Sequence, residues 1–192
     1  APEITQAQPF EICDVDYDGL AFFDLTLADF EILDRIQTNL ITNYFENESD
    51  INPNDGLDNT NEIINPSNYN SNTGTIYIKV ANSLTGCYST IPLELIVNTP
   101  PPTNTVGTIQ ICDNETNTYD LSQVDTIIVD DPSIPDISYH NTDAEAVSNI
   151  NSIGNTFNYT SANHTIHVRV SDINTGCYII QPFILQINPN PI

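Results

Sequence analysis

Three carboxylates at alternate positions form the most distinctive chemical feature of the sequence, the segment Asp14-Val-Asp-Tyr-Asp-Gly19. Carboxylate oxygens at this spacing can converge on one Ca²⁺, and the glycine permits the sharp turn that brings them together. Acids packed so closely repel one another unless a cation neutralises them. An EF-hand loop would end in a bidentate Glu at its twelfth position, where this chain has Leu25, so we expect a calcium loop of another type. The predicted ligands are Asp14, Asp16, Asp18, Leu20 and Asp24.

A shorter acidic segment occupies the corresponding place later in the chain. It lacks the glycine, although Asp120 matches Asp24, so we expect weaker Ca²⁺ binding there or none. Its candidate ligands are Asp113, Glu115, Asn117 and Asp120. The alternative for both segments is an acidic surface turn without a metal, and for a third segment, residues 50–56, an ordinary turn is favoured.

Four cysteines fall two in each half of the chain, at Cys13, Cys87, Cys112 and Cys177. Three disulfide pairings are combinatorially possible. If the two halves are copies of one module, each must close in the same way, which favours Cys13–Cys87 and Cys112–Cys177. A metal site is disfavoured because the sequence has no C-x-x-C and the thiols lack histidine partners. Disulfides indicate an oxidising location outside the cytoplasm.

The elements that position these residues come from an internal repeat. A shift of 90 residues places Thr75–Val80 on Thr165–Val170, and the Thr-Gly-Cys-Tyr run that ends at Tyr88 on the one that ends at Tyr178. The two copies correspond to residues 1–99 and 100–192, joined by a proline-rich linker at about 99–103 that favours extended polyproline II. We expect the segment to be an excerpt of a tandem array that continues in both directions.

Each copy is predicted to be rich in short strands. Aliphatic residues alternate with polar ones in Ile76–Val80 and Ile166–Val170, which is the period of a strand with one buried face. These strands form hairpins with Leu93–Val97 and Phe183–Ile187 through turn-forming residues, and Thr42–Phe45 and Ile137–His140 are predicted to be further strands. A short helix is expected in the connecting segment of each copy, where Thr26-Leu-Ala-Asp29 and Ser122-Gln-Val-Asp125 resemble capping boxes. The pattern predicts an all-β protein of two tandem immunoglobulin-like β-sandwich modules, each closed by one disulfide, with a jelly roll or other small sandwich as the alternative.

The composition limits the partners of the chain. It has 192 residues, with 26 Asp and Glu against 3 Lys and Arg, and a formal net charge of −23. Such a chain repels nucleic acid and anionic lipid. Its 39% hydrophobic content suffices for a core, and no apolar run approaches the roughly 20 residues of a membrane span. We therefore expect neither nucleic-acid binding nor membrane insertion, and a monomer when the segment is isolated.

Catalysis finds little support in the sequence. It contains no G-x-S-x-G, no glycine-rich phosphate loop and no pairing of cysteine with histidine, so we predict that the chain is not an enzyme. His164 and His167 are three residues apart on a predicted strand, which directs their imidazoles to opposite faces. Tyr88 and Tyr178 could bind a ligand, but packing on the hairpin is the favoured interpretation. The ligand-binding residues remain unassigned.

The motifs taken together resemble the tandem repeats of very large surface proteins of gliding Bacteroidetes, including adhesins exported by type IX secretion. The resemblance rests on Cys13 with its acidic loop, Phe-Asp-Leu-Thr at residues 23–26, the Thr75–Val80 strand and Thr85-Gly-Cys-Tyr88. It implies an extracellular, cell-surface stalk or adhesive repeat without catalytic residues, whose partners are neighbouring modules and a surface polysaccharide or solid substrate. The alternative is a polysaccharide-binding or accessory module of a secreted carbohydrate-active protein.

Overall fold

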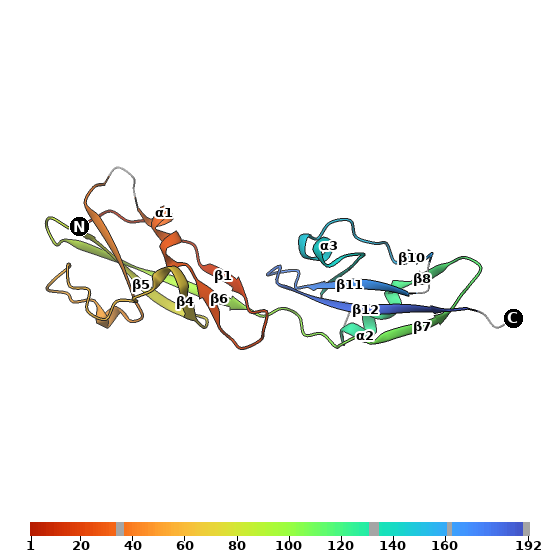
Figure 1. Ribbon diagram of the computed structural model, residues 1–192. Coiled ribbons are helices and arrows are strands. Elements are labelled where there is room, and N and C mark those ends of the chain that lie inside the picture. The colour runs from red at the N-terminus through yellow and green to blue at the C-terminus, as the bar shows by residue number, and fades with distance from the viewer. Residues whose placement is uncertain (34–36, 131–134, 161–162, 190–192) are drawn as a thin grey trace. The chain divides into compact units, whose positions relative to one another are not determined.

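The computed structural model describes residues 1–33, 37–130, 135–160 and 163–189. The chain separates into two compact units, Ala1–Asn98 and Thr99–Ile192, which we call module 1 and module 2. Both are built mainly from strands, and the longest strands of each form a hairpin (Figure 1).

Module 1 packs a larger sheet against a smaller one. Its strands are β1 (Phe10–Cys13), β2 (Ala21–Phe23), β3 (Leu40–Phe45), β4 (Tyr69–Ser71), β5 (Gly74–Asn82) and β6 (Tyr88–Asn98), and its short helices are η1 (Leu25–Ala28), α1 (Asp29–Ile32), η2 (Glu48–Asp50) and η3 (Pro66–Asn68). The four-stranded sheet has the order β1-β6-β5-β3, and β2 pairs with β4. β1 runs parallel to β6, whereas the other pairs are antiparallel.

Module 2 repeats this arrangement. Its strands are β7 (Thr108–Cys112), β8 (Thr118–Asp120), β9 (Asp136–His140), β10 (Thr156–Asn158), β11 (Asn163–Ser171) and β12 (Tyr178–Asn188), and its helices are η4 (Leu121–Val124), α2 (Asp125–Ile128) and α3 (Asp143–Ser148). The larger sheet has the order β7-β12-β11-β9, and β8 pairs with β10. Helix α3, which lies against β9 and β11, has no helical counterpart of its length in the described part of module 1.

The strand pattern read from the sequence is confirmed in both central hairpins. Ile76, Ile78 and Val80 of β5 point into the core, where they meet buried leucines of β6 and aromatic and aliphatic residues of β2 and η1. Ile166, Val168 and Val170 of β11 do the same in module 2. Burial of each such side chain contributes about 1.5–3 kcal/mol to the hydrophobic driving force. The prediction of two tandem immunoglobulin-like sandwiches is confirmed.

The helices in the connecting segments lie where they were predicted, but their caps differ. Asp24 caps η1, because its side chain accepts from the N–H of Thr26 at 3.1 Å and from its Oγ1 at 2.5 Å. Asp120 caps η4 through Ser122 in the same way. The residues read as the acids of capping boxes have another partner: Tyr44 donates its hydroxyl to Asp29 at 2.6 Å, and Tyr139 donates to Asp125.

Candidate functional site

The cysteines of each module lie at opposite ends of one long strand. Cys13 is the last residue of β1 and pairs in register with Asn98, the last residue of β6, whereas Cys87 directly precedes the first residue of β6. Eleven residues of strand separate these two ends, about 35 Å at 3.2–3.4 Å per residue. A disulfide needs Cα atoms within about 7 Å, so Cys13 and Cys87 cannot be joined.

The predicted pairing is therefore wrong. Cys13 and Cys177 are disulfide-bonded, whereas Cys87 and Cys112 are free and exposed. With four cysteines in the chain, the bond joins Cys13 of module 1 to Cys177 of module 2. The same reason excludes a bond between Cys112 and Cys177, because Cys112 pairs with Asn188 at the far end of the 11-residue β12. The disulfide couples the two modules instead of closing each one.

A tight turn holds Cys87 and Cys177 in the same local geometry. Gly86 and Gly176 adopt φ of 70° and 72°, a left-handed conformation that glycine adopts without strain. The Cys87 N–H donates to Thr85 Oγ1 at 3.3 Å, and the Cys177 N–H donates to Thr175 Oγ1 at the same distance. The Thr-Gly-Cys sequence thus presents the thiol at the start of each long strand, and the free cysteine has the local setting of the bonded one.

The acidic loop gathers three of its five predicted ligands. One carboxylate oxygen from each of Asp14, Asp16 and Asp18 lies within 4.8 Å of the others. Asp14 is only 3% exposed, and its Oδ2 accepts from the N–H of Gly19 at 2.8 Å. Its other oxygen, Oδ1, is buried with no hydrogen-bond donor among the described residues. Gly19 has φ of 81°, which allows the chain to fold back over Asp14.

The contact between the first two carboxyl groups shifts their pKa values in opposite directions. Burial alone would raise the pKa of Asp14, but the N–H of Gly19 and the side chain of Asp16, together with neighbouring backbone N–H groups, hold it below its usual value. The pKa of Asp16 is raised, because its carboxyl group faces Asp14 and is repelled by the charge of Asp18.

The other two predicted ligands lie outside this cluster. Leu20 follows Gly19 directly, and its N–H donates to Asp18 Oδ1 at 2.8 Å. Asp24 is not a member of the cluster, and its carboxylate accepts from Thr26 as the cap of η1.

The corresponding residues of module 2 form no cluster of three acids among the described residues. Asp120 caps η4, and Glu115 is exposed. The amide of Asn117, in its hydrogen-bonded orientation, donates to Asp113 Oδ1 at 3.3 Å. Tyr159 also donates to Asp113, so side-chain amide and hydroxyl groups satisfy this carboxylate.

Each module buries a cation that the sequence patterns did not predict. Lys79 of β5 is completely buried on the face of the sheet opposite the core, where its ammonium donates to the backbone carbonyl of Asp58 and lies 5.1 Å from the ring centroid of Phe45. Burial lowers the pKa of Lys79, an effect opposed by Asp58, Glu62 and Asp55.

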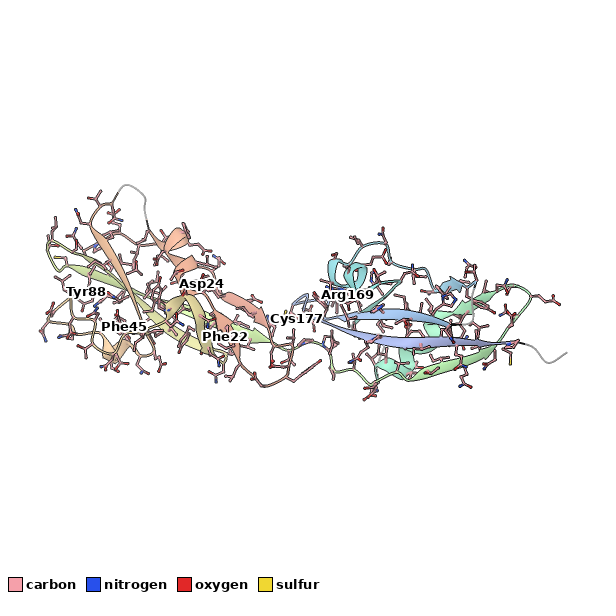
Figure 2. All side chains as sticks on the ribbon, in the orientation of Figure 1. Phe22, Asp24, Phe45, Tyr88, Arg169 and Cys177 are labelled. Atoms are coloured by element: carbon pink, nitrogen blue, oxygen red, sulfur yellow. The ribbon has the colours of Figure 1, made fainter. Side chains whose placement is uncertain are left out.

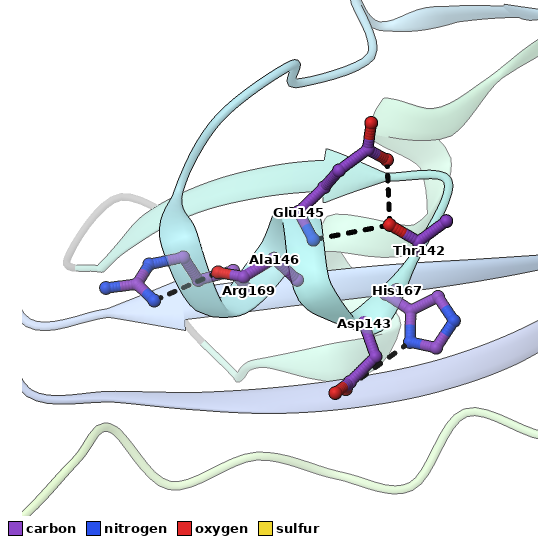
Figure 3. A network of polar contacts seen from close by, with 6 residues as sticks. All are labelled: Thr142, Asp143, Glu145, Ala146, His167 and Arg169. Carbon is purple, nitrogen blue, oxygen red and sulfur yellow. Dashed lines mark hydrogen bonds and ion pairs between the residues drawn. The ribbon is translucent and has the colours of Figure 1, made fainter.

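Arg169 of β11 is the equivalent residue in module 2. Its guanidinium donates to the carbonyls of Ala146 and Val147 at 3.1 and 3.4 Å, near the end of α3 (Figure 3), and it stacks on Tyr178 with 3.3 Å between Cζ and the ring centroid. Two of the three basic residues of this acidic chain stand at the same position of the repeat. That coincidence is the signal that could have revealed this site.

The aromatic and imidazole side chains singled out earlier have structural partners. Tyr178 covers Arg169, which is labelled in Figure 2. Tyr88 lies against the backbone at Gly56, where an added Cβ would come within 2.6 Å of its ring. His167 lies 3.8 Å from Asp143, and His164 packs edge to face on Phe157. The two imidazoles thus belong to different local contacts.

Comparison with known proteins yields the following relatives. No curated protein matches the sequence significantly. Among solved structures, the chain is similar to a three-domain immunoglobulin fragment of titin, with 8% identity, coverage of 81% of this chain and 58% of that one, and a TM-score of 0.33. Immunoglobulin domains 1–4 of Sidekick-1 share 13% identity over 96% of this chain and 48% of that one, with a TM-score of 0.35. The chain thus spans about half the length of these structures, and TM-scores this low carry no argument about function.

A protein family gives a firmer assignment. No helix among the described residues is both long enough and apolar enough to cross a bilayer. The bonded cysteines indicate an extracellular, disulfide-bearing protein. The family described as the Flavobacterium inter-domain disulphide bond domain matches residues 9–101 and again residues 108–191, one copy in each module. The chain therefore belongs to this family, whose description agrees with the bond between Cys13 and Cys177.

Proposed function

We propose that the chain is a load-bearing spacer from a large cell-surface adhesin of a gliding bacterium, exported by type IX secretion. In this proposal its modules hold an adhesive region away from the cell, toward a surface polysaccharide or a solid substrate. Tandem immunoglobulin-like modules linked by a disulfide form an extracellular structural unit, which supports this role. The sequence resemblance described above adds the adhesin and its secretion route.

One observation carries the proposal: the two free thiols occupy the repeat positions of the two bonded ones. Cys87 is equivalent to Cys177, and Cys112 is equivalent to Cys13. The backbone next to Cys112 repeats that next to Cys13, because Asp113 donates its N–H to Asn188 at 2.8 Å as Asp14 does to Asn98 at 2.9 Å. In an array, Cys87 would bond to the preceding module and Cys112 to the following one.

Such bonds would change the path that a pulling force takes. In the two-module chain the force passes directly from Cys13 to Cys177, so residues 14–176 are shielded from extension. Fully extended, this segment would span about 550 Å at roughly 3.3–3.6 Å per residue. In a continuing array, the force would cross a bond and then only the short stretch that corresponds to residues 88–111 before it reaches the next bond. An adhesin built this way resists lengthening even when its modules unfold.

Single-molecule force spectroscopy tests this mechanism. The chain is held at its two ends and stretched as the wild type and as the double variant Cys13→Ser, Cys177→Ser. We expect the variant to gain about 550 Å of contour length in module-sized steps, and the wild type to show no such steps. The matched control, Cys87→Ser with Cys112→Ser, also loses two thiols but keeps the bond, and it should behave like the wild type. Module-sized steps in the oxidised wild type would refute the mechanical role.

A mixing experiment tests the direction of the linkage in the array. The variants Cys87→Ser and Cys112→Ser each keep one free thiol, and they are combined under a glutathione redox buffer. We expect a mixed dimer joined through Cys112 of one copy and Cys87 of the other, in excess over either symmetric dimer. Symmetric dimers at the statistical ratio would show that the two thiols have no preference for each other.

A further inference from the structure

We infer that the loop from Asp14 to Leu20 is a Ca²⁺ site in which Asp14, Asp16, Asp18 and the backbone carbonyl of Leu20 are ligands. This inference does not depend on the proposed mechanical role. It starts from the three carboxylates whose oxygens lie within 4.8 Å of one another.

The buried oxygen of Asp14 is the independent observation that points to a cation. Buried carboxylate oxygens in folded proteins accept hydrogen bonds, because an unsatisfied one loses its water without compensation. Asp14 Oδ1 is buried with no donor among the described residues, while Oδ2 of the same group accepts from Gly19. A metal ion between Oδ1 and the neighbouring carboxylates would supply the missing partner.

No lysine or arginine side chain among the described residues is available as a partner for Asp14 Oδ1. Lys79 donates to the carbonyl of Asp58, and Arg169 donates to carbonyls at the end of α3. Arg35, the third basic residue, lies outside the described residues. The compensating charge at the acidic loop therefore comes most directly from solution.

The chemical type of the candidate ligands determines which metal ion is favoured. All of the candidate ligands are oxygens, which favours Ca²⁺ or Mg²⁺ over the metals that prefer thiolate or imidazole. Ligands at the first, third and fifth positions, a glycine at the sixth and a carbonyl at the seventh follow the first half of a calcium loop. Mg²⁺ demands nearly ideal octahedral geometry and keeps several waters, so a loop that supplies three carboxylates and a backbone carbonyl favours Ca²⁺.

The affinity should be modest. Leu25 stands where an EF-hand has its bidentate Glu, and the carboxylate of Asp24 is occupied as a helix cap. A reduced ligand set places the dissociation constant in the range of extracellular modules, about 10⁻⁴–10⁻³ M. Since Asp14 directly follows the bonded Cys13, ion binding would stiffen the backbone that carries the inter-module bond.

Calcium titration of the ¹⁵N-labelled two-module chain, stripped of metal with EDTA, tests the site. The Gly19 amide contacts Asp14, so its chemical shift should move saturably with a midpoint of about 0.1–1 mM. The Gly86 amide lies in the turn before β6, at the end of module 1 opposite Cys13, and should not move. Mg²⁺ should need at least roughly tenfold higher concentrations.

Two variants separate coordination from general charge effects. Asp16→Asn removes one ligand from an exposed position, and we expect the midpoint to rise roughly 10-fold or more. Glu115→Gln removes one exposed charge from the corresponding segment of module 2 and should leave the midpoint unchanged. The inference is overturned if the Gly19 amide shows no saturable shift by 5 mM Ca²⁺, if Asp16→Asn binds as well as the wild type, or if Mg²⁺ binds equally well.

Discussion

Module 1 and module 2 bury a basic residue at the same position of the same central strand, but they cover it with different structures. In module 1 the cover is the irregular segment that contains Asp58, and Lys79 reaches one carbonyl there. In module 2 the cover includes α3, and Arg169 reaches two carbonyls near its C-terminal end. This position of the central strand therefore carries a cation that donates to backbone carbonyls of the covering segment. Whether the cation is lysine or arginine depends on the structure of that segment.

The choice of side chain matches the number of acceptors. A single ammonium group suits one carbonyl, whereas the planar guanidinium of Arg169 can donate to two carbonyls while it stacks on Tyr178. A cation near the C-terminal carbonyls of a helix is also favoured by the helix dipole. The two modules thus use different chemistry to tie a variable covering segment to a constant sheet.

Truncation of these cations should give the largest loss of stability. Lys79→Ala removes a fully buried stem and leaves the Asp58 carbonyl without its donor, so we expect a loss of roughly 2–5 kcal/mol in the free energy of unfolding of module 1. Arg169→Ala should cost module 2 a similar amount. Hydrogen exchange followed by mass spectrometry on peptides of each module measures the two effects separately.

A second variant distinguishes packing from hydrogen bonding. Lys79→Met keeps most of the buried stem and loses the ammonium, with its hydrogen bond and its contact with the Phe45 ring, so its cost should be about 1–3 kcal/mol. If Lys79→Met and Lys79→Ala were equally destabilising, the buried stem would contribute nothing. If neither variant affected module 1, the covering segment would be held by other contacts.

The sequence predicted the repeat and the central hairpins because their signals are local. Alternation in Ile76–Val80 and the glycine of the Thr-Gly-Cys turn depend on neighbours within a few residues, and both reappear after 90 residues. Two agreeing copies made the interpretation firmer than one would have been. Helix α3 was missed although Thr142 and Glu145 form a reciprocal capping pair at its start, a signal that was available (Figure 3).

The disulfide could not be predicted because it depends on contacts distant in sequence. The repeat correctly matches Cys13 with Cys112 and Cys87 with Cys177, but equivalence does not say which thiols are close. Only the parallel pairing of β1 with β6 shows that Cys13 and Cys87 lie at opposite ends of a module. Similarly, the acidic loop was recognisable from its spacing, whereas the use of Asp24 as a cap requires the position of η1.

The pairs between tyrosine and aspartate offer a smaller test, in which the two modules should behave alike. Tyr44 and Tyr139 are 4% and 3% exposed, and each donates to a carboxylate that lies just after a capped helical turn. Burial, together with that carboxylate, raises the pKa of each hydroxyl above its usual value, so both stay protonated donors at neutral pH.

Tyr44→Phe and Tyr139→Phe should each destabilise their own module by about 1.5 kcal/mol, because a hydrogen bond to a charged acceptor is lost while the ring remains. Urea denaturation, with hydrogen exchange to assign the module, measures the effect. Tyr77→Phe is the control, since it removes a hydroxyl from β5 of the same module that takes no part in the bond to Asp29. A marked difference in the stability lost by the two variants would show that the tyrosine–aspartate hydrogen bond does not contribute equally to the two modules.

The smallest expected effect is a difference in acid sensitivity at the segment that covers Lys79. Hydrogen bonds from the side chains of Asn52 and Thr60 and from the N–H of Thr60 lower the pKa of Asp58 to about 2, from 3.8. A carboxyl whose folded pKa is depressed contributes stability above its unfolded pKa and loses it as pH falls through the folded value. Module 1 should therefore lose stability between about pH 4 and pH 2 in a way that Asp58→Asn abolishes.

The free energy of unfolding, measured at steps across this pH range, tests the expectation. Asp136→Asn, an exposed change in module 2, is the control. An unchanged acid dependence in Asp58→Asn would mean that the segment covering Lys79 is held to the sheet independently of this carboxylate.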